Sequence, residues 1–293
     1  MEGRTRAQTA GWLVLLLIGQ VVALALLWHF AVRTGHGQAL DTVALAGNSI
    51  GQDRVDGLTS TVLNAMSVLS LLLATGVIGF IALIRGRLAL AVLATLLIAG
   101  ANLTTQLLKY LIIRPDLGVD PERAAAGNSL PSGHTAVAAS VAVALVLVLP
   151  RTFRAWGAVL GAGYTALAGV ATLSAGWHRP SDALAALLVV GAWAAFVGLL
   201  LVRTQRARAQ VAPGDAHHRT TNLLVVLGVV LLAVAAAAIA RTDPLLSMPV
   251  DELTRRQLLV AYAGGAAGIT GAASLMMALV LATVHRVVPR QPG

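Results

Sequence analysis

Long apolar runs alternate with short polar segments along the whole chain. A helix needs about 20 apolar residues to cross a bilayer. Runs of about this length lie at roughly 12–32, 60–84, 88–108, 135–150, 155–173, 183–202, 222–240 and 258–284. The first is longer than the apolar part of a signal peptide, which has about 7–15 residues, and a helix start at Thr135 extends the short fourth run. The pattern therefore predicts eight membrane-spanning helices.

Composition and charge agree with a membrane protein. Of the 293 residues, 57% are hydrophobic and 11% are charged, whereas an average soluble domain is about 25% charged. The chain has no cysteine, which excludes disulfides and thiolate-bound metals. The net charge of +9 is spread over short clusters, so we expect no nucleic acid partner. We predict an all-α polytopic membrane protein with six core helices and a C-terminal helix pair.

The basic residues predict which helix ends face the cytoplasm. When successive loops are assigned to alternate sides, one side carries twelve of the 21 Lys and Arg and only two acids, Glu2 and Asp215. The twelve are Arg4, Arg6, Arg85, Arg87, Arg151, Arg154, Arg203, Arg206, Arg208, Arg219, Arg286 and Arg290. Cytoplasmic loops carry an excess of Lys and Arg. We therefore expect a plasma membrane protein with both termini in the cytoplasm and with loops 109–134 and 174–182 on the outer, periplasmic face.

Four segments follow from this pattern. They are an N-terminal helix with an outer loop (1–59), a helical core (60–202), a basic cytoplasmic linker (203–221) and a C-terminal helix pair (222–293). We interpret the linker as an anchor on anionic lipid, with a regulatory role as the alternative. Its adjacent His217 and His218 are read as solvated residues rather than a metal site. In the last helix, Gly264 and Gly268 have the spacing that lets helices pack closely, within the chain or, as the second use, in a homo-oligomer.

The stretch "NSLPSGHTAVAAS", Asn128–Ser140, places a polar turn directly before an apolar run. Pro131 ends the loop, Ser132 can cap the helix, and Gly133 lets backbone N–H groups come close to a ligand. Such a helix N-terminus favours anions, phosphate above all, and His134 lies within hydrogen-bond reach of an anion held there. The alternative is an ordinary helix cap followed by a polar residue.

Two further outer segments carry ionisable residues. Lys109, the only lysine, and Arg114 occur in "QLLKYLIIRPDLG", where a lone basic residue at a helix end can also be an interfacial anchor. In "LSAGWHRPSDALAAL", His178 and Asp182 are four residues apart, so the carboxylate can hold the imidazole in one tautomer. A capping Asp beside an interfacial His is the alternative. An imidazole held in this way can act as a nucleophile or a base.

Together the three segments predict a site for phosphoryl transfer on one side of the membrane. Cations and amides would stabilise the phosphoryl oxygens, one histidine would attack phosphorus, and the other would protonate the leaving oxygen. This design requires no metal and no cofactor, and no cluster of carboxylates is present to hold a metal.

These residues resemble the type 2 phosphatidic acid phosphatase (PAP2) superfamily, whose signature is K-x6-R-P, P-S-G-H and S-R-x5-H-x3-D. The resemblance covers roughly residues 60–200, and the middle motif, Pro131 to His134, matches in full. It implies that His178 is a nucleophile forming a phosphohistidine, that Asp182 orients it, and that His134 is the general acid. The residues that the resemblance implies as ligands of the phosphoryl oxygens are Lys109, Arg114, Ser132 and Gly133 through its amide.

The first and third motifs depart from the family pattern. Four residues separate Lys109 from Arg114 where the family has six, so either the helix end is remodelled or Asp116 occupies the usual arginine position. The Ser-Arg pair of the third motif falls on Ala171 and Thr172. Loss of a charged donor from a transition-state clamp costs on the order of 10²–10³ in rate. We hypothesise that Arg179 binds substrate and partly compensates. The alternative is a residue that faces lipid headgroups.

The sequence predicts hydrolysis of a phosphate or pyrophosphate on a membrane lipid, such as a prenyl carrier or a phosphatidic-acid-like glycerolipid. Transfer of the phosphoryl group to an alcohol is the alternative reaction, because an alcohol can attack the same phosphohistidine in place of water. A non-catalytic binder or transporter of anionic lipid is the alternative from another class.

Overall fold

The computed structural model describes residues 2–50, 57, 61, 68–120, 127–204 and 217–288, and within these ranges the chain forms only helices and their connections. The helices are α1 (Glu2–Arg33), α2 (Gly35–Ala46), α4 (Val68–Ile84), α5 (Leu88–Leu111), α7 (Gly133–Val148), α8 (Arg151–Ser174), α9 (Pro180–Thr204), α10 (His218–Thr242) and α11 (Arg255–Val287). Short 3-10 turns are η1 (Gly47–Ser49), η2 (Asp243–Leu245) and η3 (Val250–Glu252). The predicted all-α class is confirmed.

Six of the described helices are long and apolar enough to cross a membrane, namely α1, α5, α8, α9, α10 and α11. Helices α4 and α7 are apolar but shorter. Each of the eight coincides with one predicted apolar run, although part of the run at 60–84 lies outside the described residues. The chain therefore has the helices of a polytopic membrane protein.

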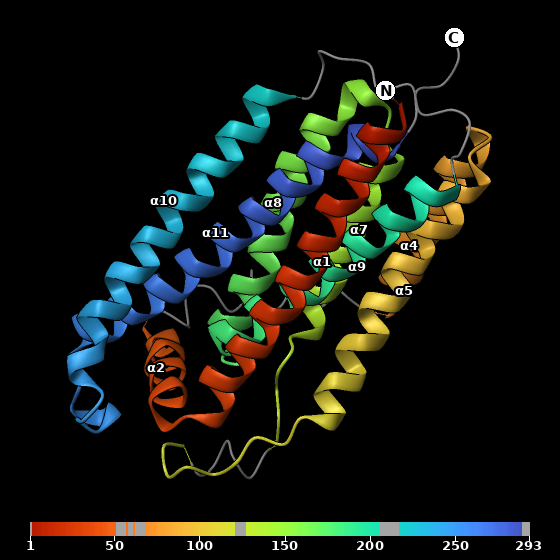
Figure 1. Cartoon of the computed structure of the whole chain (residues 1–293). Coiled ribbons are helices and arrows are strands. Elements are labelled where there is room, and N and C mark those ends of the chain that lie inside the picture. The colour runs from red at the N-terminus through yellow and green to blue at the C-terminus, as the bar shows by residue number, and fades with distance from the viewer. Residues whose placement is uncertain are drawn as a thin grey trace.

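Helix α9 lies inside the bundle, where it contacts α1, α5, α7 and α11 (Figure 1). Small residues make this close packing feasible, since Ala139 on α7 and Ala186 on α9 are fully buried in the main core. At Gly100 on α5, an added Cβ would lie 2.5 Å from the ring of Trp193 on α9. A side chain at position 100 would therefore clash with the Trp193 ring, and the glycine lets α5 and α9 pack closely.

The C-terminal pair also packs through small residues. A Cβ at Gly264 on α11 would lie 2.4 Å from the Cβ of Ala238 on α10, and Gly268 faces Ala235. Helix α11 in turn packs against α8. The small-residue face predicted at Gly264 and Gly268 is thus used within the chain.

The predicted outer loop after the first span contains a helix, α2, which lies across one end of the bundle (Figure 1). Thr34 caps it by accepting the N–H of Gly37 at 3.0 Å. Helix α2 contacts α1, α9 and α11, and its His36 pairs with Asp243 of the α10–α11 connection at 2.8 Å.

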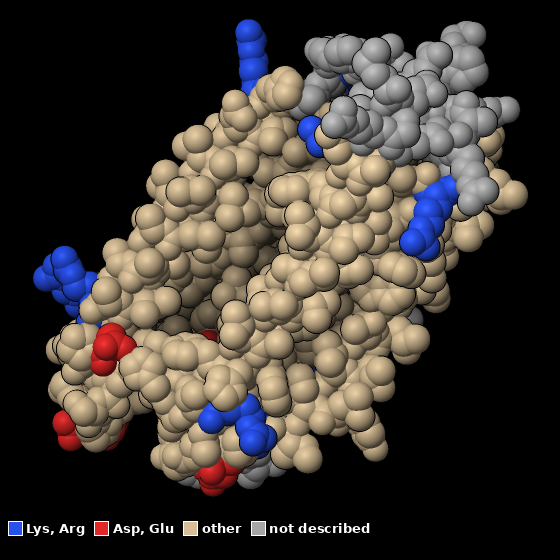
Figure 2. Space-filling view, viewed as in Figure 1, with Lys and Arg blue, Asp and Glu red and all other residues tan. Residues whose placement is uncertain are grey.

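The start of α1 and the end of α11 lie at the opposite end of the bundle from α2 (Figure 1). In the view of Figure 2, the visible acidic side chains lie at the α2 end, whereas basic side chains occur at both ends. The predicted division of acids between the two sides stays a prediction, because Asp215 and the side chain of Glu2 lie outside what the structure describes. The cytoplasmic location of the termini stays a prediction of the positive-inside rule.

Candidate active site

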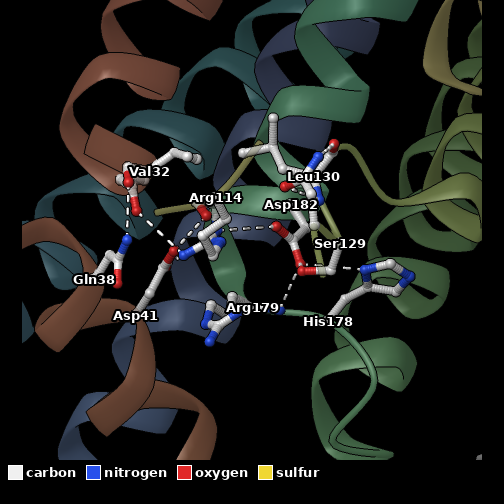
Figure 3. Close-up of polar contacts among 12 residues, drawn as sticks. Val32, Gln38, Asp41, Arg114, Ser129, Leu130, His178, Arg179 and Asp182 are labelled. Carbon is white, nitrogen blue, oxygen red and sulfur yellow. Dashed lines mark hydrogen bonds and ion pairs between the residues drawn. The ribbon is translucent and has the colours of Figure 1, made fainter. Parts of the chain in front are cut away.

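The residues predicted to carry chemistry meet at the α2 end of the bundle, where three chain segments converge on the start of α9 (Figure 3). They are the segment after α5, the turn before α7, and the loop between α8 and α9. A backbone bond from the N–H of Ser132 to the carbonyl of Asp182, 2.8 Å long, ties the second segment to α9. The structure therefore brings the segments together.

Asp182 is the centre of the polar network. It lies in the first turn of α9 and is fully buried. Its Oδ2 atom accepts the hydroxyl of Ser129 at 2.6 Å and the backbone N–H of Arg179 at 3.0 Å, and lies 3.2 Å from Nδ1 of His178. A neutral imidazole that donates its Nδ1–H to this carboxylate carries its lone pair on Nε2. Asp182 can therefore present Nε2 of His178 as a nucleophile.

The loop that carries His178 is shaped by the backbone of Thr172. The carbonyl of Thr172 accepts the N–H of Trp177 at 3.0 Å and that of His178 at 3.2 Å. The Thr172 side chain is fully buried, and its hydroxyl donates to the carbonyl of Gly169 within α8. At the position where the family pattern has an arginine, this chain therefore has an uncharged side chain that is hydrogen-bonded within α8.

His134 lies in the first turn of α7, next to the His178 loop. Its ring centroid is 5.5 Å from the ring of Trp177, the residue before His178. His134 and Gly133 are partly exposed, whereas His178 is buried. The first N–H groups of a helix have no partner within the helix, so the start of α7 offers free donors beside a partly exposed imidazole.

Ser132 acts as the N-cap of α7. Its Oγ accepts the backbone N–H of Thr135 at 3.4 Å and the Thr135 hydroxyl at 3.0 Å, and the side chain is fully buried. The capping role that the sequence allowed is therefore present. A contact between the Ser132 hydroxyl and a phosphoryl oxygen stays a prediction.

Lys109 and Arg114 occupy different environments. Lys109 is partly exposed in the last turn of α5, and its carbonyl accepts the side-chain amide of Asn128. Helix α5 ends at Leu111, so Arg114 lies in an extended segment, with its Nη2 3.8 Å from Oδ1 of Asp182. Burial and the neighbouring Arg179 lower the pKa of the Arg114 guanidinium.

The shortened spacing between Lys109 and Arg114 lies where α5 ends, at Leu111. Asp116 is exposed, and its carboxylate accepts the N–H of Gly118 at 2.9 Å in a local turn. Of the two sequence-based alternatives, the geometry favours a remodelled helix end, because Arg114 faces the site and Asp116 does not.

Arg179 directs its side chain away from the imidazole of His178 and toward the side of Asp41 (Figure 3). Its Nη2 donates to Oδ2 of Asp120 at 3.3 Å, and the side chain is buried. One donor of the guanidinium is therefore used by Asp120, whereas its buried Nε has no hydrogen-bond partner among the described residues.

Residues 87–209 match the family model of the PAP2 superfamily. These residues are therefore a PAP2-superfamily segment. No curated protein and no solved structure gave a match. The PAP2 segment runs from the start of α5 to beyond α9 and contains the predicted site residues. Helices α1, α2, α4, α10 and α11 lie outside it.

Two buried polar residues of α2, outside the PAP2 segment, contact the site and were missed by sequence reasoning. Asp41 accepts the backbone N–H of Ser181 at 3.3 Å and also accepts the Ser181 hydroxyl. Burial, reinforced by the nearby Asp182, raises the pKa of Asp41 to about 6. Gln38 donates to the carbonyls of Val32 at 2.8 Å and Pro115 at 3.1 Å. The available signal was a pair of polar residues three apart in an otherwise apolar stretch.

Ser129 and Asp120 also contribute to the PAP2 site without having been predicted. Ser129 precedes the fully matching motif by two residues and donates to Asp182, whereas Asp120 holds Arg179. Among the described residues, no group of three or more His, Cys, Asp or Glu is placed to hold a metal ion.

Proposed function

We propose that this PAP2 protein is a membrane phosphatase that hydrolyses the phosphate or pyrophosphate of a lipid through a phosphohistidine on His178. Family membership supports phosphatase chemistry in general. The observation that carries the specific proposal is the pair formed by His178 and Asp182. The buried carboxylate lies 3.2 Å from Nδ1 of the ring, which leaves Nε2 for attack on phosphorus.

The reaction has two balanced steps. In the first, the lone pair on Nε2 of His178 forms a bond to phosphorus while the bond from phosphorus to the leaving oxygen breaks, and His134 gives that oxygen a proton. In the second, His134 takes a proton from water, the water oxygen forms a bond to phosphorus, and the bond from phosphorus to Nε2 breaks. Its electron pair returns to the imidazole of His178, and inorganic phosphate is released. Asp182 stabilises the imidazole as it gains positive charge.

Lys109 and the first amides of α7 are suited to bind the phosphoryl oxygens. Lys109 is the only lysine and is partly exposed near the site. The N-terminus of α7 provides the dipole and N–H donors that favour phosphate. Substrate-binding roles for Arg114, Ser132 and Arg179 are part of the proposal but have less geometric support than that of Lys109, because all three side chains are buried.

A lipid substrate is supported by the apolar surroundings of the site. Tyr110, Ile113 and Trp177 lie on the segments that form it and are 86%, 80% and 51% exposed. Aromatic residues are enriched where a membrane meets water, so a lipid phosphate at headgroup depth would reach the site from the bilayer. We propose that this end faces the outer side of the plasma membrane and that the termini are cytoplasmic. The phosphohistidine also allows transfer to an alcohol instead of water.

Thr172 favours a second candidate function, binding of an anionic lipid without turnover. A family arginine is replaced by a buried threonine there, which removes one cation from the clamp around the transition state. In that case the protein retains affinity for lipid phosphate but does not release phosphate.

Phosphate release by purified protein in lipid nanodiscs separates the two candidates. We expect release from at least one member of a panel of lipid monophosphates and pyrophosphates, with chelator present, and its loss in His178→Ala. His29→Ala provides a matched control, since His29 is exposed on α1, a helix that contributes none of the predicted catalytic residues. Lipid binding without release in the wild type would support the non-catalytic candidate.

A further inference from the structure

Helix α2 contacts two of the three segments that form the site. Gln38 and Asp41 are three residues apart, so they lie on the same face of the helix, and both are buried. Gln38 reaches the carbonyl of Pro115 on the segment after α5, and Asp41 reaches Ser181 at the start of α9. These segments are more than 60 residues apart in the chain, and α2 connects them.

Each contact lies one residue from a charged member of the site. Pro115 follows Arg114, and Ser181 precedes Asp182. Arg114 and Asp182 face each other at 3.8 Å, and Asp182 in turn holds His178. A displacement of either segment would therefore change the position of the carboxylate that orients the imidazole.

A buried acid at position 41 is costly, because a carboxylate loses hydration when it is buried. Asp41 is surrounded by Ser181 and Asp182 of α9 and by the charges of Arg114 and Arg179. An apolar residue of similar size would avoid this cost but would leave Ser181 without its partner. The acid at position 41 is therefore better explained by its contact with Ser181 than by a contribution to the stability of the fold.

The last two helices support α2 from its other side. Val43 and Ala44 of α2 pack with Leu253 and Ala261 in a separate apolar cluster. At Gly47, directly after α2, an added Cβ would lie 2.4 Å from the carbonyl oxygen of Leu258 on α11. The backbone after α2 is therefore fitted closely against α11.

We propose that α2 is a positioning element of the active site, in which Gln38 and Asp41 hold the Arg114–Pro115 and Ser181–Asp182 segments in register, and that α11 holds α2 in place. This inference rests on the proposed function of His178 and Asp182. It assigns a role in the site to parts of the chain outside residues 87–209, the PAP2 segment.

Steady-state kinetics of Asp41→Asn and Gln38→Leu test this role. Misplacement of a reacting group by about 1 Å can cost on the order of 10²-fold in rate, and we expect each variant to lose about 10-fold or more in kcat with KM within twofold. Ser181→Ala removes the hydroxyl that donates to Asp41, so it perturbs the same contact as Asp41→Asn, and the double variant should be little slower than the slower single variant. His36→Ala, which removes an exposed side chain of the same helix and its contact with Asp243, should leave kcat unchanged.

A second measurement does not depend on turnover. In protein labelled with 15N-histidine, the His178 signals, assigned by their loss in His178→Ala, report which ring nitrogen carries the proton. We expect Asp41→Asn and Gln38→Leu to shift these signals and His36→Ala to leave them in place. Unchanged His178 signals in both variants, or unchanged kcat per folded protein, would overturn the positioning role. Absence of turnover in the wild type would contradict the proposed function instead, and the NMR result would still decide the role of α2.

Discussion

Arg114 and Asp182 face each other inside the protein, with Nη2 of the arginine 3.8 Å from Oδ1 of the carboxylate. Their side chains are 1% and 0% exposed. Arg114 lies on one side of Asp182 and His178 on the other (Figure 3). In this arrangement Arg114 contacts the residue that orients the nucleophile, and Lys109 is the better placed of the two to meet a substrate at the surface.

Substitutions at these two cations should therefore have different effects. Arg114→Met removes the guanidinium that faces the buried Asp182, and loss of one partner of a buried ion pair costs about 3–5 kcal/mol of stability. Lys109→Met should raise KM or lower kcat/KM but change the free energy of unfolding little, because Lys109 is partly exposed. Thermal unfolding and kinetics of both variants check this. Equal loss of stability in the two would contradict the division of roles.

Ser129 should influence the chemical step through Asp182. Ser129→Ala removes a 2.6 Å hydrogen bond to Oδ2, the oxygen that also contacts His178. Hydrogen bonds to charged groups contribute about 1.5–3 kcal/mol, so we expect phosphohistidine formation to slow by about 10-fold or more, as measured by rapid quench. Ser49→Ala, at an exposed serine whose hydroxyl bonds only a local carbonyl, should have the wild-type rate. A wild-type rate in Ser129→Ala would show that this bond does not act on catalysis.

Asp41 should make stability fall as pH rises. Its pKa is raised from 3.8 to about 6, so between about pH 4 and pH 6 the unfolded chain loses a proton that the folded protein retains. The stabilising contribution of the protonated Asp41 carboxyl is fully present below about pH 4 and is lost above about pH 6. Asp41→Asn has no such group, so its melting temperature relative to the wild type should be higher at pH 7 than at pH 4. A difference in melting temperature that does not change with pH would contradict the raised pKa.

Arg179 distinguishes two accounts of the missing arginine. If Arg179 replaces it, Arg179→Ala should lower kcat on the order of 10²–10³-fold. Its bond to Asp120 and its direction away from His178 lead us to expect a loss of less than about 10-fold. Phosphate release by Arg179→Ala decides between them, with the loss in Lys109→Met as the reference.

The sequence predicted those features that depend on local patterns. The apolar runs are long enough to define spanning helices without knowledge of their neighbours. The contact between His178 and Asp182 follows from a spacing of four at the start of a helix, and the cap at Ser132 from its place before an apolar run. Each of these features is contained within a few consecutive residues.

Features that depend on tertiary contacts were not predicted. The pairing of Arg114 with Asp182 arises because α5 ends at Leu111 and the chain then runs extended across the site. Helix α2 has only 12 residues and two glycines, which weaken a helical signal, so the sequence predicts a loop there. The roles of Gln38 and Asp41 became visible only when their partners, Pro115 and Ser181, were placed beside them.

Trapping of the covalent intermediate is the most direct test of the central claim. Wild-type protein is mixed with a lipid pyrophosphate labelled in its terminal phosphate, quenched in base, digested and analysed by mass spectrometry. We predict acid-labile phosphate on the peptide that contains His178, and none in His178→Ala. Label on another residue, or phosphate release that persists in His178→Ala, would contradict the account.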